Sequence, residues 1–155
     1  MKRGVRFLIP DRNSSNHSLG DILKPIPCPL YKWAIGCTEI HLYKEDAMND
    51  GFLFSEQDVL NGSELERAVN DQAYLAVCAE LKAFPITAAV TDIVDYEEFV
   101  NSECEIVVLL VDCSYVDIYC KNTELIEDVY HYVHQKGYTD IEYIDENDSR
   151  TKMYV

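Results

Sequence analysis

The chain has 155 residues, of which 48% are hydrophobic and 26% are charged, and its formal net charge is −15 at pH 7. This length fits one domain, residues 1–155, with enough apolar residues to bury a core. The negative charge repels phosphate backbones, so we do not expect a nucleic acid as a partner. No apolar run approaches the roughly 20 residues of a membrane-spanning helix, so we do not expect a membrane as a partner either.

The first forty residues predict short strands and one helix. Apolar residues at every second position predict a strand at 5–9. A short helix is predicted at 19–23, where the proline at position 25 ends it. The same alternation at 31–35 and again at 40–42 predicts two strands that pair as a β-hairpin.

The middle of the chain contains two helix-start signals. Ser55 is expected to open a helical stretch, which Gly62 interrupts. Ser63 is expected to cap a second helix that runs to about residue 70, because Ser63-Glu64-Leu65-Glu66 matches a capping box. Each serine would satisfy backbone N–H groups that have no partner within the helix.

Residues 73–84 fit two patterns. The apolar residues form a stripe with a period of two and also a helical stripe, so the periodicity leaves strand and helix open. We choose the strand, because turn-forming residues precede the segment and Pro85 follows it. Glu80 and Lys82 would then lie together on its polar face.

The last third of the chain begins with another capping box. Asp95 is expected to start a short helix that ends near Ser102. The apolar run at 105–111 predicts a buried strand, and the alternation at 115–120 predicts a second strand after a tight turn.

Capping residues then predict the longest helix, at 123–136. Asn122 or Thr123 suits its N-cap, acidic residues crowd its positive end, and Gly137 suits the left-handed position after its last turn. Strands are predicted after it at 138–144 and 151–155.

This order of elements predicts an α+β fold in a single domain. Hairpins outnumber βαβ units, which favours a mainly antiparallel sheet with helices packed on one face. A right-handed crossover through the 123–136 helix would add one parallel pair and make the sheet mixed.

The six cysteines contain no C-x-x-C pair and therefore no zinc-knuckle or dithiol redox motif. The amino terminus lacks the apolar core of a signal peptide, so we expect a cytoplasmic protein with free, structural thiols. The cysteines are Cys28, Cys37, Cys78, Cys104, Cys113 and Cys120.

Enzyme signatures are missing from the sequence. It contains no G-x-S-x-G nucleophile elbow and no G-x-G-x-x-G or P-loop motif. Pairs of carboxylates are abundant, but coincidence explains them in so acidic a chain. The sequence therefore favours a non-enzymatic protein, for which no cofactor is expected.

One face of the predicted 123–136 helix carries three potential metal ligands. Glu127, His131 and His134 share this face, and such spacing can bring side chains together around zinc or iron. A structural role without a metal is the stronger interpretation, because histidines near the carboxyl end of a helix interact favourably with the helix dipole. Glu127 and His131 also form an ordinary i,i+4 pair.

Acidic residues and tyrosines concentrate in the same part of the chain. Residues 92–155 hold 16 acidic and 4 basic residues, a net charge of −12, together with eight of the eleven tyrosines. Tyrosine is enriched at interfaces, although it also favours any half-buried strand. The best candidate partner-binding residues are Tyr115, Asp117 and Tyr119 on one strand face, with Asp140 and Glu142 on another strand.

Three segments resemble a family of small uncharacterised acidic proteins from spore-forming Gram-positive bacteria. The segments are MKRGV at 1–5, LGDILKP at 19–25 and ELKAFP at 80–85. The resemblance covers the whole chain and implies a cytoplasmic bacterial protein without an established activity. It carries over no site residue.

Three hypotheses follow from the sequence. The first is a non-enzymatic interaction protein that presents its acidic, tyrosine-rich face to a basic protein partner, in the manner of an immunity protein or an inhibitor. The second is a metal-dependent enzyme or metal sensor that uses the Glu127, His131 and His134 face. The third is a structural homo-oligomer in which tyrosine and Trp33 surfaces pair with themselves.

Overall fold

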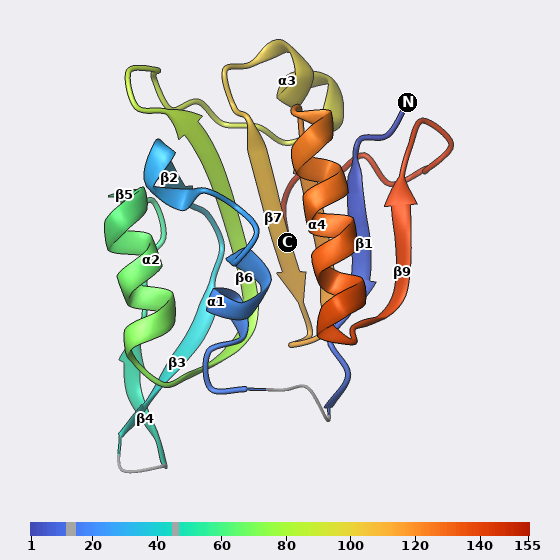
Figure 1. Ribbon diagram of the computed structural model, residues 1–155. Helices are drawn as coiled ribbons and strands as arrows, with labels where there is room; N and C mark the ends of the chain where they lie inside the picture. The colour runs from blue at the N-terminus through green and yellow to red at the C-terminus, as the bar shows by residue number, and fades with distance from the viewer. Residues whose placement is uncertain (12–14, 45–46) are drawn as a thin grey trace.

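The computed structural model describes residues 1–11, 15–44 and 47–155 as an open β-sheet flanked by helices (Figure 1). The strands are β1 (Gly4–Leu8), β2 (Tyr31–Ile35), β3 (Glu39–Lys44), β4 (Ala47–Phe52), β5 (Val59–Asn61), β6 (Tyr74–Pro85), β7 (Ile106–Val111), β8 (Tyr115–Cys120) and β9 (Thr139–Ile144). The helices are α1 (Ser18–Leu23), the short 3₁₀ helix η2 (Cys28–Leu30), α2 (Gly62–Asp71), α3 (Tyr96–Asn101) and α4 (Thr123–Lys136).

Every pairing between the described strands is antiparallel. The sheet runs in the order β4-β3-β6-β7-β8-β1-β9, and β2 and β5 extend it beside β6. β8 and β9 point in the same direction, but β1 lies between them and pairs with both. The crossover through α4 therefore forms no parallel pair, because β1 fills the space that such a pair would occupy. The α+β fold with a mainly antiparallel sheet is confirmed.

The predicted hairpin of β2 and β3 is wrong. β3 pairs with the first half of β6, and β2 pairs with the second half. A three-residue link with a bend at Cys37 joins them, and within it the Gly36 N–H donates to the Glu80 carbonyl at 2.8 Å. The two strands thus lie end to end along β6, whose twelve residues offer an edge long enough for both. This confirms the strand at 73–84.

The helical stretch predicted from Ser55 is also wrong. Its place is taken by a turn, in which the Ser55 N–H donates to the Asp58 side chain at 2.9 Å and Gln57 has a φ of 70°. The short strand β5 follows and pairs with β2. Pairing with a neighbouring strand overrides the local helix signal here.

Helix α2 is capped by Asn61 rather than by Ser63. The Asn61 side chain accepts a hydrogen bond from the Glu64 N–H at 2.9 Å and donates one to the Glu64 carboxylate. The predicted capping box is therefore displaced by two residues, since an asparagine already occupies the position where β5 ends and the helix begins.

We expect Asn61→Ala to lower the free energy of unfolding by about 1 kcal/mol, because the Glu64 N–H loses its acceptor. The matched control is the exposed Ser63→Ala, which should change it by less than about 0.5 kcal/mol. Urea denaturation followed by circular dichroism measures both. A larger loss for Ser63→Ala than for Asn61→Ala would contradict this assignment of the cap.

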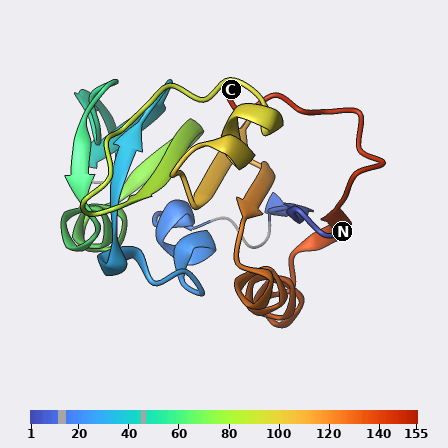
Figure 2. The same ribbon diagram turned by 90° about the horizontal axis from the view of Figure 1, so that it is seen from above.

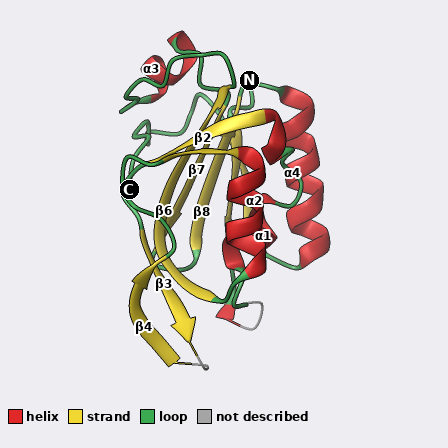
Figure 3. Ribbon diagram, turned by 90° about the vertical axis from the view of Figure 1, so that its left-hand side faces the viewer, coloured by secondary structure: helices red, strands yellow, loops and turns green. Residues whose placement is uncertain are grey.

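Helices α1, α2 and α4 cover one face of the sheet, as predicted (Figures 2 and 3). The main hydrophobic core lies between them and the sheet. Helix α3 lies on the opposite face, where it packs with the C-terminal segment around a second hydrophobic cluster that includes Phe99, Tyr119 and Met153. The prediction of helices on one face thus holds for three helices and fails for α3.

The C-terminal segment covers the second face without forming the strand predicted at 151–155. Lys152 makes a single bridge to Asp95, and the fully buried Met153 anchors the segment. This cover also buries Glu80 and Lys82, which the sequence placed on a polar face. They form an ion pair at 3.1 Å, and Lys82 also donates to the Ile93 carbonyl at 2.8 Å. None of the described helices combines the length and the hydrophobicity that crossing a bilayer requires.

Candidate functional site

A groove of about 820 Å³ lies on the second face of the sheet, beyond the part that α3 covers. It is bounded by strands β1, β7, β8 and β9 and by the C-terminal segment. Its lining combines apolar, aromatic and charged side chains, among them Leu8, Leu109, Val111, Tyr115, Asp117, Asp140, Glu142, Arg150, Lys152 and Tyr154. A concave surface with an apolar floor and a few polar groups is typical of a binding site.

The alternation of side chains along β8 explains how the groove forms. Successive residues of a strand point to opposite faces, so Val116 and Ile118 enter the main core while Tyr115 and Asp117 face the groove. The side chain of Tyr115 is 58% exposed at the groove, and Val111 beside it on β7 is 39% exposed.

The structure brings four of the five predicted partner-binding residues together. Tyr115, Asp117, Asp140 and Glu142 all line the groove. Tyr119 does not, because α3 covers its end of β8 and its ring packs against Tyr96 with the ring centres 6.2 Å apart. Tyr119 is only 1% exposed, and burial raises its pKa to about 12. It belongs to the second hydrophobic cluster and is not available to a partner.

Arg6 of β1 organises the charged part of the groove. Its guanidinium donates to both carboxylate oxygens of Asp117, at 2.7 and 2.8 Å, and it also bonds to Asp148. The bidentate geometry makes this pair directional as well as electrostatic. Burial alone would lower the pKa of Arg6, but the bonds to Asp117 and Asp148 outweigh it and raise the pKa.

Asp148 is held by the same network. Burial alone would raise the pKa of Asp148, but the Arg150 backbone N–H, which donates at 2.8 Å, and the Arg6 guanidinium lower it below its usual value. Asp148 and Asp117 therefore satisfy Arg6, which makes them parts of the scaffold of the groove rather than its free acids.

Arg6 was not among the residues predicted from the sequence. A signal was nonetheless present, because Arg6 lies between Val5 and Phe7 and must face away from the core that these residues enter. What the sequence could not show is that β1 pairs with β8 in the register that sets Arg6 directly opposite Asp117.

Two acidic side chains remain at the rim of the groove. The Glu142 side chain is 59% exposed and lies 3.6 Å from Arg6, while Asp140 is exposed at a bulge of β9 where its φ is 52°. On the C-terminal segment, Lys152 lies over the ring of Tyr154 at 4.5 Å. The rim on β9 is thus acidic and open to solvent.

The proposed metal ligands on α4 make other contacts. Glu127 accepts hydrogen bonds from Lys2 at 2.6 Å and from the Tyr143 hydroxyl at 2.8 Å, and these bonds lower its pKa. His131 and His134 are exposed and pack edge-on against Tyr130. Within the part of the chain that the structure describes, no three such ligands are placed to hold a metal ion. The metal hypothesis stays a prediction that this geometry does not support.

The surface proposed for a homo-oligomer is partly wrong, because Trp33 is fully buried in the main core and cannot pair with a second copy. Its indole N–H donates to the Cys28 carbonyl at 3.1 Å. The cysteines are free, as predicted.

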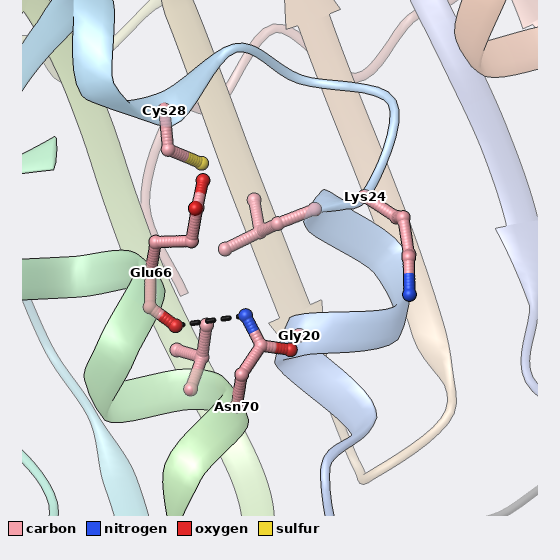
Figure 4. Close-up of a pocket in the computed structure, with 7 residues that line it drawn as sticks. Gly20, Lys24, Cys28, Glu66 and Asn70 are labelled. Atoms are coloured by element: carbon pink, nitrogen blue, oxygen red, sulfur yellow. Dashed lines mark hydrogen bonds between the residues drawn. The ribbon is translucent and has the colours of Figure 1, made fainter. Parts of the chain in front are cut away.

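A smaller cavity of about 250 Å³ lies between α1 and α2 (Figure 4). Cys28, Glu66 and Asn70 line it, and the Asn70 side-chain amide donates to the Glu66 backbone carbonyl at 2.7 Å. Burial and the nearby Glu66 charge raise the pKa of the Cys28 thiol to about 12, so this thiol stays protonated at neutral pH. The groove on the second face is larger and carries more exposed recognition groups.

Comparisons with known proteins identify relatives but no activity. The family described as "Protein of unknown function (DUF2691)" matches residues 2–154. The "Uncharacterized protein YncE" of Bacillus subtilis is 38% identical over 156 residues, which cover 100% of both chains. No solved structure matches. The resemblance to an uncharacterised bacterial family is confirmed.

Proposed function

Because the chain belongs to the DUF2691 family, whose description assigns no activity, we propose from the groove itself that the protein binds a basic protein partner. The observation that carries this proposal is the placement of exposed Tyr115 beside the exposed acids Asp140 and Glu142 around one groove. The protein would act without catalysis, by occupying the basic surface of its partner as an inhibitor or immunity protein does.

Charge favours a basic occupant over a neutral or acidic one. The whole chain carries −15, and its last 64 residues, which supply most of the groove, carry −12. Such a field attracts basic proteins and repels acidic ones, and it speeds association at low salt. Arg6, Arg150 and Lys152 also line the groove, but Arg6 is bonded to Asp117 and Asp148 and reaches Glu142 only at 3.6 Å, and Arg150 lies 3.5 Å from Asp148.

The shape of the groove suggests how the partner is held. A lysine or arginine of the partner would meet Glu142 and Asp140 at the rim, while an apolar side chain would enter beside Tyr115 and Val111. Aromatic residues in a hollow commonly supply most of an interface's binding energy, and rim charges set specificity and rate.

Glu142 is a better position for a charge reversal than Asp117. Asp117 is bonded to Arg6, so a charge reversal there would damage the sheet as well as the binding surface. Glu142→Lys alters an exposed rim charge instead. Glu56→Lys is its matched control, because Glu56 is equally acidic and exposed but lies in the turn before β5.

The experiment places a photo-crosslinking phenylalanine analogue at position 115 and identifies the protein it captures from a Bacillus subtilis lysate. We expect a basic protein whose affinity falls as the salt concentration rises. Glu142→Lys should weaken binding of that purified protein roughly tenfold, and Glu56→Lys should leave it nearly unchanged.

Three results would overturn the proposal. They are the capture of no protein at position 115, the capture of a protein without a basic surface, and equal weakening by Glu142→Lys and Glu56→Lys. The last result would mean that net charge alone, rather than the groove, drives association.

A further inference from the structure

Three cysteines outside the groove lie along the first half of β6. Cys78 belongs to β6 itself, where it is paired with Glu39 of β3. Cys37 lies at the bend before β3, one residue after Gly36, whose N–H bonds to the Glu80 carbonyl of β6. On the other edge, the Cys113 N–H of the β7–β8 turn donates to the Val77 carbonyl at 2.8 Å.

Cys37 lies between two backbone contacts with β6, the hydrogen bond from Gly36 to Glu80 and the pairing of Glu39 with Cys78. Its thiol is near enough to raise the pKa of Cys78, although forty residues separate the two cysteines in the sequence, which contains no C-x-x-C pair. This proximity arises because β2 and β3 lie end to end along β6, which brings the link between them against this strand. Cys37 is exposed and Cys78 is partly exposed, so a small oxidant can reach the pair.

Three of the other four thiols are buried, unlike Cys37 and Cys78. Burial raises the pKa of Cys28, Cys104 and Cys120 to about 12 in each case, which keeps them protonated and shielded. Cys113 is exposed, and burial and the neighbouring Asp112 charge raise its pKa.

We propose that Cys37 and Cys78 are a modification site at which hydrogen peroxide forms a reversible intramolecular disulfide. The exposed Cys37 reacts first. Its thiolate sulfur attacks a peroxide oxygen, the O–O bond breaks, and the departing hydroxide takes a proton to leave as water.

Cys78 completes the reaction. Its sulfur attacks the sulfenic sulfur of Cys37, an S–S bond forms, and hydroxide leaves with the Cys78 proton as a second water. Two thiols thus lose two electrons, and one peroxide is reduced to two waters. Cys37 is the more exposed of the two thiols and therefore meets the peroxide first, while burial, the Cys37 thiol and the Glu39 charge raise the pKa of Cys78.

The chain's own cleavage sites make the test direct. Trypsin separates the two cysteines, because Cys37 falls in the peptide 33–44 and Cys78 in 68–82, while Cys113 shares the peptide 83–121 with Cys104 and Cys120. The folded wild-type protein is treated with one equivalent of hydrogen peroxide, blocked with an alkylating agent, digested and analysed by mass spectrometry without reduction.

We expect a protein lighter by about 2 Da, a crosslinked pair of peptides 33–44 and 68–82, and full recovery of both thiols with a reductant. Cys113→Ser should behave like the wild type. Cys78→Ser should stop at a Cys37 sulfenic acid that dimedone traps.

Because the wild-type digest needs no variant, misfolding of a variant cannot hide the answer. A disulfide that joins either cysteine to the peptide 83–121, a disulfide between two molecules, or a Cys37 sulfinic acid without the crosslinked pair would each overturn the proposal.

Discussion

Replacing Trp33 by alanine should lower the free energy of unfolding by about 4 kcal/mol, because it opens a large cavity in the main core. Trp33 is fully buried on β2, where it lies between Leu60 of β5 and Ala83 of β6. The change also removes the donor to the Cys28 carbonyl, which η2 holds 3.1 Å from the indole nitrogen. A buried acceptor without a donor adds to the cost.

Urea denaturation followed by circular dichroism measures this loss, since the variant lacks the chain's only tryptophan and hence its fluorescence signal. Trp33→Phe is the matched control. It keeps an aromatic ring in the core but loses the indole donor, so about half of the alanine loss is expected. A loss below about 1 kcal/mol for Trp33→Ala would contradict the position of β2 in the sheet.

The part of the fold that could be predicted is the part set by local signals. Helix α4 begins after Asn122, which accepts bonds from the Glu124 and Leu125 N–H groups, and ends at Gly137 with a φ of 84°. β7 and β8 likewise follow from an apolar run, a tight turn and an alternating run. Each of these features depends on neighbours within a few residues.

The mistakes concern pairing between distant segments. Residues 31–35 and 40–42 have the composition of a hairpin, and only the length of β6 shows why they lie end to end instead. The strand β5 was missed for a related reason, because its pairing with β2 outweighs the helix signal at Ser55. Sequence periodicity describes which face a residue occupies but not which strand lies beside it.

The candidate groove was predictable in part. Alternation along β8 places Tyr115 and Asp117 on the groove face, and Asp140 and Glu142 of β9, which were named as candidates on another strand, also line the groove. The same alternation placed Tyr119 on that surface, because nothing local reveals that α3 covers that end of the face. The proximity of Cys37 and Cys78 has the same origin in strand order and was not predicted.

Replacing Arg6 by leucine should lower the free energy of unfolding by about 3 kcal/mol, because it leaves two largely buried carboxylates without their partner. The side chains of Arg6, Asp117 and Asp148 are only 12%, 21% and 14% exposed. Breaking such a network by removing one member costs more than the network contributes to stability, since the remaining charges stay desolvated. Arg6→Lys should recover only part of the loss, because an ammonium cannot make the bidentate bond to Asp117.

The dependence of stability on pH separates this network from simple packing. The pKa of Asp148 is lower in the folded protein than its usual value, so its contribution is fully present above about pH 4 and is lost as the pH falls through the folded-state pKa. Arg6→Leu should reduce the fall in the free energy of unfolding at low pH, and Asp148→Asn should reduce it too.

The double variant Arg6→Leu with Asp117→Leu is the decisive control for the network. If unpaired charge causes the loss, removing a carboxylate together with the guanidinium should restore about half of it, because an apolar pair across β1 and β8 needs no desolvated partner. Stability equal to or below that of Arg6→Leu alone would instead mean that Arg6 stabilises the sheet through its aliphatic stem. Packing rather than ion pairing would then determine the shape of the groove. The rim acids Asp140 and Glu142 would not depend on the network of Arg6, Asp117 and Asp148.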